Sequence, residues 1–526
     1  MKNDKTEKRS FIKSVRNYFR EYCTCTSIHG FKYFGEKRTY FERFWWFIVF
    51  GCTLAVCIFT ITIVYQRWLQ SPIIVSFATR DTPIYSIPFP AVTICSESKS
   101  IQSKYSHMGV ARKLFLNENL TEEEQYLEDY VESVCDTKLW TGSTKPYLPD
   151  FIETMENISE SLHIISCSFM NEQSCSALFK PIITDEGFCY TFNMLDRSEI
   201  YNEKVVHHSY YHAMGNLTYE NWTVENGFAS DAGINPYPRR ALMAGVNHGL
   251  TVHLKTIRAN IDHICKLSLQ GYRVSVHLPS RVPSLRQEYF RVPLDQAVLA
   301  VVNPSMITTS ETVRYYSPAR RECYFSTERS LKYFKTYTNK NCLLECLTNY
   351  TLKHCGCVAH YMPRDNETEI CGPGNTPCMS AAEEDYQLYD LRKKIGVGGN
   401  ETTRIEHLDD CDCMPMCSDL SYNVDISQSD WKFWEVEARL LGSDTNLSSD
   451  GLHVSKLTIF FKSSHFITTQ RHEFYGPTDF LANFGGLLGL FTGVSVLSVM
   501  EAIYFLTVRI CCNTRLYGYW AGPQQL

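Results

Sequence analysis

Two long runs without a charged residue interrupt a chain in which polar and apolar positions otherwise alternate over short distances. Residues 44–66 form the first run, and residues 480–500 form the second, whose apolar character continues past Glu501 to Val508. About 20 residues of α-helix cross the apolar core of a bilayer. The pattern therefore predicts two membrane-spanning helices, one at 44–66 and one at 480–508.

A cleaved secretory signal is the alternative interpretation of the first run. However, the run follows 43 residues that are mostly polar, and no small-x-small cleavage site precedes the return of charge. A signal peptide has an apolar core of only about 7 to 15 residues. We therefore interpret 44–66 as a span.

The charge beside the two runs predicts the orientation of the chain. Residues 1–43 carry eleven Lys or Arg and five acids, and residues 509–526 carry two Arg and no acid. Positive charge is retained on the cytosolic side of a membrane. We expect a two-pass plasma-membrane protein with cytosolic segments at 1–43 and 509–526 and an extracellular domain at 67–479. The tails carry net charges of +6 and +2. Because the whole chain has a net charge of −6, the residues between the tails carry −14.

Composition excludes several other classes of protein. Hydrophobic residues make up 44% of the chain, which is too many for a disordered protein, and the acidic balance argues against nucleic-acid binding. The chain has no Gly-x-Ser-x-Gly, His-Glu-x-x-His or phosphate-loop motif. We therefore expect no enzyme activity, no cofactor and no metal site.

Cysteines and glycosylation sequons support an oxidising compartment for 67–479. Sixteen of the 22 cysteines lie between the two runs, which suits as many as eight disulfides. They are Cys95, Cys135, Cys167, Cys175, Cys189, Cys265, Cys323, Cys342, Cys346, Cys355, Cys357, Cys371, Cys378, Cys411, Cys413 and Cys417. All eight sequons fall in the same interval, at Asn119, Asn157, Asn216, Asn221, Asn349, Asn366, Asn400 and Asn446.

The extracellular part is expected to mix strands and helices, as an α+β domain rich in disulfides. Alternating apolar residues predict strands at 272–277 and 457–462. Closely spaced cysteines in 342–417, around a helix-compatible stretch at 381–394, indicate a helical subdomain stapled by disulfides. Zinc binding is the rival interpretation, but the segment has no Cys-x2-Cys pair.

The second run carries the candidate chemistry. Gly485, Gly489 and Gly493 recur every four residues, so a continuous helix would present them as one stripe. Close packing of helices is one interpretation of such a stripe. Polar groups in the same run favour a water-filled interior, in which carbonyl groups near Gly493 and the hydroxyl of Ser495 face a narrow axis. One helix cannot enclose such a path, so we expect an oligomer.

Two further features of this region are candidates for ion flow and gating. Glu501 lies about 31 Å along a helix from Phe480, which places its carboxylate near the inner edge of the bilayer, as part of an inner-pore ring or as an interfacial ion pair. Gly476 lies in the short link 475–478, through which motion outside the membrane would reach the span.

Five ordered motifs make the chain resemble the degenerin and epithelial sodium channel family over nearly its whole length. They are His29-Gly30, Phe89-Pro-Ala-Val-Thr-Ile-Cys95, Gly187-Phe-Cys-Tyr-Thr-Phe-Asn193, Cys411-Asp-Cys-Met-Pro-Met-Cys417 and Gly493-Val494-Ser495. Within the family, residues 479–509 and Met306-Ile-Thr-Thr-Ser310 most resemble the insect pickpocket branch.

The resemblance implies a homotrimer or heterotrimer of related subunits, with a palm sheet, β-ball, finger, knuckle and thumb outside the membrane. It implies a gated, sodium-preferring pore blocked by amiloride, in which Na⁺ is the permeant ion and membrane lipid surrounds the spans. Gly493, Val494 and Ser495 would form the selectivity filter. His29 and Gly30 would form a cytosolic gating motif, and Ala482 the position where bulky residues hold related channels open. Residues 342–417 would be the thumb.

Two residues depart from the family pattern. Val494 replaces the commoner alanine of the filter, which leaves the preference for sodium over potassium open. Arg320 stands about where proton-gated relatives carry a tryptophan, so acid gating is not implied. The stimulus stays open among protons, small-molecule or peptide ligands, osmotic change and stretch.

Two other functions remain as alternatives. An ATP-gated channel shares the two-span topology, but the chain has no group of Lys and Arg suited to a triphosphate. A non-conducting or regulatory receptor subunit would use the glycines only for helix packing.

Overall fold

The computed structural model describes residues 2–70, 73–139, 142–170, 172–207, 220, 222–395, 411–436 and 451–522. These residues form two compact units. One unit comprises Met1–Ile74 and His472–Leu526, and the other comprises Val75–Arg471.

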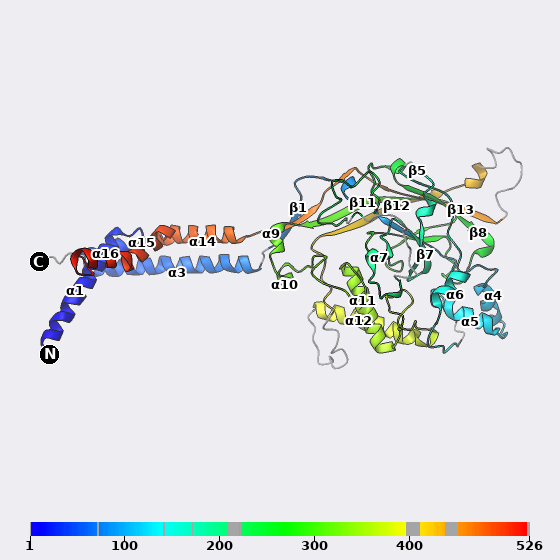
Figure 1. Ribbon diagram of the computed structural model, residues 1–526, viewed down its shortest axis with the longest axis horizontal. Coiled ribbons are helices and arrows are strands. Elements are labelled where there is room, and N and C mark those ends of the chain that lie inside the picture. The colour runs from blue at the N-terminus through cyan, green and yellow to red at the C-terminus, as the bar shows by residue number, and fades with distance from the viewer. Residues whose placement is uncertain are drawn as a thin grey trace. The chain divides into compact units, whose positions relative to one another are not determined.

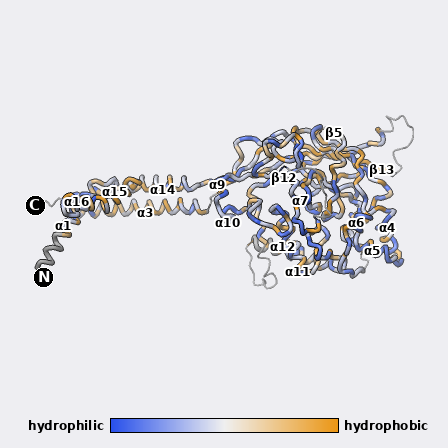
Figure 2. Tube along the Cα trace, in the orientation of Figure 1, coloured by the Kyte–Doolittle hydropathy of each residue, from blue (hydrophilic) through white to orange (hydrophobic). Residues whose placement is uncertain are grey.

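The first unit is helical and contains both apolar runs. Its helices are α1 (Lys2–Cys25), α2 (Phe31–Gly35), α3 (Tyr40–Gln70), α14 (Pro477–Thr492), α15 (Val496–Leu506) and α16 (Val508–Tyr517). Figure 1 shows α3 and α14 side by side, and the stacked rings of Trp68 and Phe480 join them, with centroids 5.2 Å apart. Segments Tyr40–Leu69 and Val496–Tyr517 are each long and apolar enough to cross a membrane, and the apolar colour of α3, α14 and α15 is visible in Figure 2.

The second apolar run differs from the single helix expected over 480–508. It contains α14 and α15, with three residues, Gly493 to Ser495, between them, and α16 begins only at its last residue, Val508. Pro477 occupies the first turn of α14, where the missing N–H costs no hydrogen bond. The first span also extends further than expected, because α3 continues to Gln70.

The second unit is built on two β-sheets. The larger has eight strands in the order β1-β15-β11-β13-β8-β4-β5, with β12 pairing with β11. Their bounds are β1 (Ile73–Phe77), β4 (His163–Phe169), β5 (Glu172–Gln173), β8 (Leu250–Ile257), β11 (Gln296–Thr309), β12 (Asp419–Asp430), β13 (Leu452–Phe461) and β15 (Thr469–Glu473). Side chains of β8 alternate between buried and half-buried, the period of a strand with one face on the core.

The smaller sheet has five strands in the order β10-β9-β3-β7-β6. They are β3 (Ala91–Ser96), β6 (Lys180–Thr184), β7 (Gly187–Phe192), β9 (Tyr272–His277) and β10 (Phe290–Val292), and β2 (Thr82–Pro83) pairs separately with β14 (His465–Phe466). One apolar core joins residues of both sheets, among them Ile94, Phe192 and Leu457. β9 has the bounds predicted from the sequence, and β13 includes most of the other predicted strand.

Helices surround these sheets. They are α4 (His107–Phe115), α5 (Glu122–Val131), α6 (Phe151–Ile158), α7 (Arg197–Ile200), α9 (Glu311–Arg314), α10 (Pro318–Arg321), α11 (Asn339–Cys355) and α12 (Thr376–Ile395). Short 3₁₀ turns are η1 (Ile84–Ser86), η2 (Ser176–Leu178), η3 (Val246–His248), η4 (Arg258–Asn260) and η5 (Pro373–Asn375). α12 covers the helix predicted at 381–394, and the mixture of sheets and helices confirms the α+β class.

The sixteen cysteines between the apolar runs are joined in eight disulfides. The pairs are Cys95–Cys189, Cys135–Cys265, Cys167–Cys175, Cys323–Cys417, Cys342–Cys413, Cys346–Cys411, Cys355–Cys378 and Cys357–Cys371. Three of them connect α11 to α12 or to 411–413, and Cys357–Cys371 closes a loop in the segment between the two helices. Each bridge restricts the unfolded chain, so the set stabilises a region that has little apolar core of its own.

The sequon asparagines are divided between the described and the undescribed parts of the chain. Asn119, Asn157, Asn349 and Asn366 are exposed, so a glycan on any of them would meet no buried neighbour. Asn216, Asn221, Asn400 and Asn446 lie outside the described residues.

Candidate functional site

The break between α14 and α15 begins at Gly493. Its φ of +70° is in the left-handed region, which glycine adopts without strain, and its N–H donates to the carbonyl of Gly489 at 3.0 Å. A side chain there would also be obstructed, as described below. Thus glycine at 493 ends the helix, although its spacing from Gly485 and Gly489 suggested a continuous stripe.

Ser495 starts the next helix. Its hydroxyl accepts the N–H of Ser498 at 3.3 Å, while the N–H of Ser495 donates to the hydroxyl of Ser498 at 3.1 Å. This reciprocal arrangement is a capping box, which satisfies two backbone donors that helix geometry leaves without partners. The Ser498 hydroxyl also donates to the carbonyl of Gly493 at 3.4 Å. Ser498 therefore forms hydrogen bonds with both the first and the last residue of the break.

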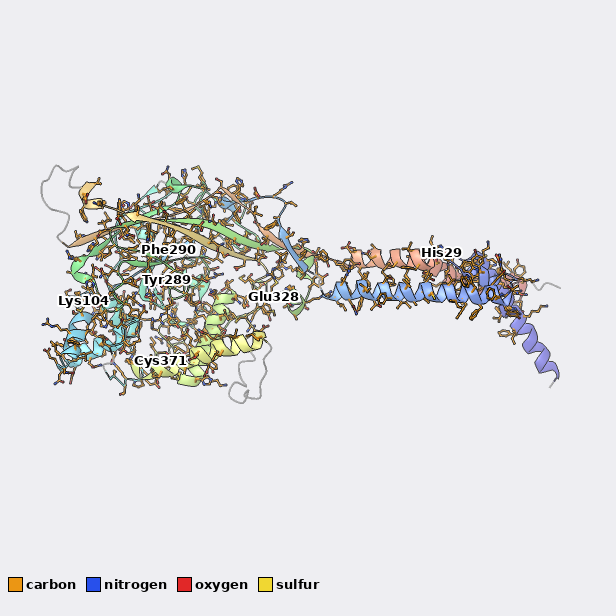
Figure 3. All side chains as sticks on the ribbon, turned by 180° about the vertical axis from the view of Figure 1, so that it is seen from behind. His29, Lys104, Tyr289, Phe290, Glu328 and Cys371 are labelled. Atoms are coloured by element: carbon orange, nitrogen blue, oxygen red, sulfur yellow. A yellow bond between two sulfur atoms is a disulfide. The ribbon has the colours of Figure 1, made fainter. Side chains whose placement is uncertain are left out.

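His29 and Gly30 lie against this break. The N–H of His29 donates to the carbonyl of Thr492 at 2.9 Å. A β-carbon built on Gly493 would lie 2.7 Å from Cδ2 of His29, so the imidazole packs directly on the glycine. Gly30, with φ of +85°, turns the chain from this contact into α2. Figure 3 shows His29 in the helical unit, beside the helices that carry the break.

Ser27 makes a second contact between the N-terminal segment and α15. Its hydroxyl is 2.6 Å from the hydroxyl of Ser498. The carboxylate of Glu501 accepts the N–H and the hydroxyl of Ser27 at 3.3 and 3.4 Å. Sequence reasoning did not identify Ser27, and its only signal was its place two residues before the His-Gly pair.

Helix ends make this break suitable for a cation. The last carbonyl groups of α14 lack partners within the helix, and they form the negative end of its dipole. Because glycine has no side chain and serine has a small one, the backbone is accessible at both positions. In the single chain Gly493 is half-buried and Ser495 is exposed. Backbone carbonyls and hydroxyls are the oxygen ligands that bind a partly dehydrated alkali cation.

The other predicted gating residues lie further along α14. Ala482 is exposed and eleven residues before Gly493, or about 16 Å away along a helix. Gly476 is buried at the start of α14, where its N–H donates to the carboxylate of Asp479 at 3.1 Å. The structure therefore brings His29, Gly30, Glu501 and the break together, and it leaves Ala482 and Gly476 apart from them.

Within the described residues, the glycine stripe of α14 has open space beside it. A β-carbon built on Gly485 or on Gly489 would meet no atom within 4 Å. Leu481 and Leu490 on the same helix are 67% and 74% exposed. A stripe of small residues that is open to close approach is what a helix needs to pack against other copies or to line a pore.

Comparison with known proteins identifies the chain's relatives. Residues 22–505 match the sequence model described as "Amiloride-sensitive sodium channel". The chain belongs to the amiloride-sensitive sodium channel family. This is the degenerin and epithelial sodium channel family that the five motifs indicated, so that prediction is confirmed.

Individual members of the amiloride-sensitive sodium channel family align with nearly the whole chain. Pickpocket protein 28 of Drosophila melanogaster is 30% identical over 521 residues, which are 97% of this chain and 80% of that protein. Sodium channel protein Nach of the same species is 23% identical over 96% of this chain and 90% of its own length. Acid-sensing ion channel 1 of Gallus gallus is 24% identical over 91% and 82%. The pickpocket resemblance is thus also confirmed.

Membership of the amiloride-sensitive sodium channel family sets the general function. The family consists of sodium-permeable cation channels rather than enzymes, and its members form multimers with related subunits. Two apolar helical segments near the ends of the chain fit the two-pass topology of the family.

Proposed function

We propose that the chain is a subunit of a trimeric, gated channel that prefers Na⁺, is blocked by amiloride and lies in the plasma membrane with both termini in the cytosol. It acts alone or with related subunits in sensory or epithelial cells. No cofactor takes part, and Na⁺ is the cargo. The observation that supports this most is the helix break at Gly493 to Ser495 with His29 packed against it.

The irregular backbone at the helix break supports the proposal of a pore, because lipid cannot form hydrogen bonds with backbone groups. Such backbone is tolerated only where protein buries it or water reaches it. Here α3 covers one side of α14, and Cys57 on α3 approaches the carbonyl of Leu487 at 3.9 Å. In the part of the chain that the structure describes, Gly485, Gly486 and Gly489 have open space beside them. Three chains with these glycines facing inward would enclose a narrow path lined by carbonyl groups.

The exterior adds an electrostatic contribution. The chain between the tails carries a net charge of −14, which raises the local concentration of cations near the outer mouth. This effect is strongest at low ionic strength, because exposed charges are screened over about 8 Å at physiological salt. Glu501, held by Ser27, would add a carboxylate at the inner mouth from each subunit.

The experiment is voltage clamp of cells that express the chain alone or with related subunits. Replacing Ala482 by Val should produce a constitutive inward Na⁺ current that amiloride blocks, because a larger side chain at this exposed position of α14 hinders closure. The matched control is Ala55→Val on α3, also exposed, which should leave the channel closed at rest. Absence of current in Ala482→Val, with normal surface levels and with every co-expressed subunit, would contradict the proposal.

A further inference from the structure

A cavity in the unit of residues 75–471 has the size of a small-molecule site. It lies between α11, α12 and the segment 278–289 that connects β9 to β10, and its volume is about 510 Å³. Sites for small ligands commonly measure about 300 to 1,000 Å³. Figure 3 labels Tyr289, the last residue of this connecting segment, and Phe290, the first residue of β10.

One wall of the cavity is apolar. Leu343, Leu344 and Leu347 line it from α11, and Leu391 lines it from α12. Residues separated by three or four positions share one face of a helix, so the α11 leucines form one continuous surface. The three leucines of α11 are half-buried and Leu391 is 51% exposed, so this wall is accessible to a ligand from outside.

Three residues that line the cavity each carry a buried polar atom without a hydrogen-bond partner among the described residues. Within the described part of the chain, the Ser275 hydroxyl, the Arg281 Nε and the Asn341 side-chain oxygen are buried and make no hydrogen bond. Ser275 and Asn341 are each only 2% exposed. Unpaired buried polar atoms are rare in folded proteins, so these three are places where water or a ligand binds.

Two of the acids near the cavity already have partners. The Asp185 carboxylate accepts the N–H groups of Leu285 and Arg286 at 2.9 and 3.0 Å. Glu288 pairs with Lys340 at 2.9 Å. Glu288 also interacts electrostatically with Arg281, while Arg286 and Lys340, which line the same cavity, add positive charge to it.

Among the described residues, Arg281 forms one ion pair, and its distance is long. Its closest acid is Asp419, the first residue of β12, at 3.7 Å from Nη2, which leaves Nε without an acceptor. A bound anion would therefore complete the contacts of the guanidinium. Glu383 also lines the cavity, and Asn341 lacks a donor, so the ligand must bring hydrogen-bond donors as well as an acid.

We propose that this cavity binds a small amphipathic organic acid. The carboxylate binds Arg281, an amide or hydroxyl group donates to Asn341, and a chain of several carbons lies on the leucines of α11 and α12. This site is separate from the helix break, and binding there does not depend on conduction.

Arg281 also connects the cavity to the large sheet. It lines a second cavity of about 480 Å³, together with Tyr422 and Val424 of β12. A ligand that binds the guanidinium would compete with Asp419 at the start of that strand. Regulation of ion flow by the ligand rests on the proposed function, whereas the binding itself does not.

The test is isothermal titration of the purified full-length protein with three probes. N-octanoylglycine has the acid, the amide and the chain, its methyl ester lacks the acid, and N-acetylglycine lacks the chain. N-octanoylglycine should bind with one site per chain, and the other two at least about tenfold more weakly, because each loses one set of contacts. The same protein carrying a pore substitution that abolishes current should bind equally well, which separates this proposal from the channel function.

Two variants locate the binding. Arg281→Gln removes the cation, and Leu347→Glu places a carboxylate on the half-buried apolar wall, so each should weaken N-octanoylglycine at least about tenfold. Arg80→Gln, at an exposed arginine away from the cavity, should not. If Arg281→Gln fails to fold, Leu347→Glu decides.

Several results would overturn the proposal. The proposal fails if N-octanoylglycine shows no saturable binding, because water alone would then occupy the cavity. Another such result is equal binding of its methyl ester, which would show that the acid is not recognised. A third is a Leu347→Glu protein that binds the probe normally but no longer assembles, which would make this wall a contact between subunits.

Discussion

The imidazole of His29 fills the space that a side chain at residue 493 would occupy, since a β-carbon on Gly493 would lie 2.7 Å from Cδ2 and 2.9 Å from Nε2 of that ring. The left-handed backbone at Gly493, with φ of +70°, separately disfavours any other residue. Residues 464 positions apart in the chain are therefore matched in shape. A change at either should alter the same structure.

Gly493→Ala should abolish most of the current while the protein still reaches the cell surface. The substitution combines a left-handed backbone penalty of about 1 to 2 kcal/mol with the clash against His29, and both act at the helix break rather than in the extracellular unit. Whole-cell current and surface biotinylation measure the two quantities. Gly51→Ala on α3 is the matched control, because a β-carbon there meets no atom within 4 Å.

The double variant His29→Ala with Gly493→Ala tests the contact itself. Removing the ring removes the clash, so the double variant should conduct better than Gly493→Ala alone. Residues in contact show interaction free energies of about 0.5 to 3 kcal/mol in such cycles. Strictly additive losses would mean that the two residues act independently.

Ser27 and Glu501 should also prove coupled. Glu501→Gln removes the charge that the N–H and hydroxyl of Ser27 bind, and hydrogen bonds to charged groups are roughly twice as strong as neutral ones. We expect the open probability to change several-fold in Glu501→Gln and to change little further when Ser27→Ala is added. Single-channel recording measures it.

Thr24→Ala is the control for this pair, since it removes an exposed hydroxyl from the same segment that bonds only to the carbonyl of Glu21 among the described residues. It should leave gating unchanged. Independent effects of Ser27→Ala and Glu501→Gln would show that the carboxylate acts on the permeating ion alone.

The main elements of this fold could be predicted from local patterns. Charge-free runs locate α3 and the segment that forms α14 and α15, and alternation gives β9 its bounds. Cysteine spacing indicates the stapled helical part around α11 and α12, where two bridges close short loops, although Cys342–Cys413 and Cys346–Cys411 join residues 71 and 65 positions apart.

The helix break at Gly493 and the packing of His29 against it could not be predicted in the same way. Gly485, Gly489 and Gly493 have helical spacing, and only the backbone of Gly493 shows that the last of them ends the helix. The contact of His29 with Thr492 joins distant segments, and no periodicity reports it. Leu343 and Leu347 have the spacing of a core-facing pair, so their place on a cavity wall was equally hidden.

Gly476→Ala should slow gating without reducing expression. Its φ of −81° suits alanine, and the β-carbon would meet only the end of the Glu473 side chain, at 2.8 Å, which can move. The effect then comes from a stiffer link, worth about 0.4 to 1 kcal/mol, or a two- to fivefold change in rates. Rapid solution exchange on excised patches measures opening and closing.

Glu473→Ala distinguishes stiffness from collision at this link. Combined with Gly476→Ala it should leave the slowed gating unchanged, because the displaced carboxylate is not the cause. If the double variant instead gates normally, the collision with Glu473 explains the defect and the stiffness of the link does not.

A buried histidine should make the stability of the extracellular unit depend on pH. His107, at the start of α4, is fully buried, with Nδ1 3.1 Å from Asp262 and Nε2 3.4 Å from Glu128. Burial disfavours the charged ring, but a hydrogen bond to Asp262 and the negative charges of Asp262 and Glu128 outweigh it and raise the pKa of His107 to about 9. The charged ring therefore stabilises the fold fully below the unfolded pKa of about 6.5, and this contribution is lost as pH rises to 9.

His107→Gln should accordingly cost about 3 kcal/mol of unfolding free energy more at pH 6 than at pH 9.5, from a pKa difference of about 2.5 units. Thermal unfolding of the purified protein at the two pH values measures this, and the gap in midpoint between wild type and variant should narrow at pH 9.5. His163→Gln is the control, because that side chain is 42% exposed and 3.8 Å from Glu160, so its ion pair contributes little. An equal gap at both pH values would mean that His107 is neutral in the folded protein and that its ring contributes only by packing.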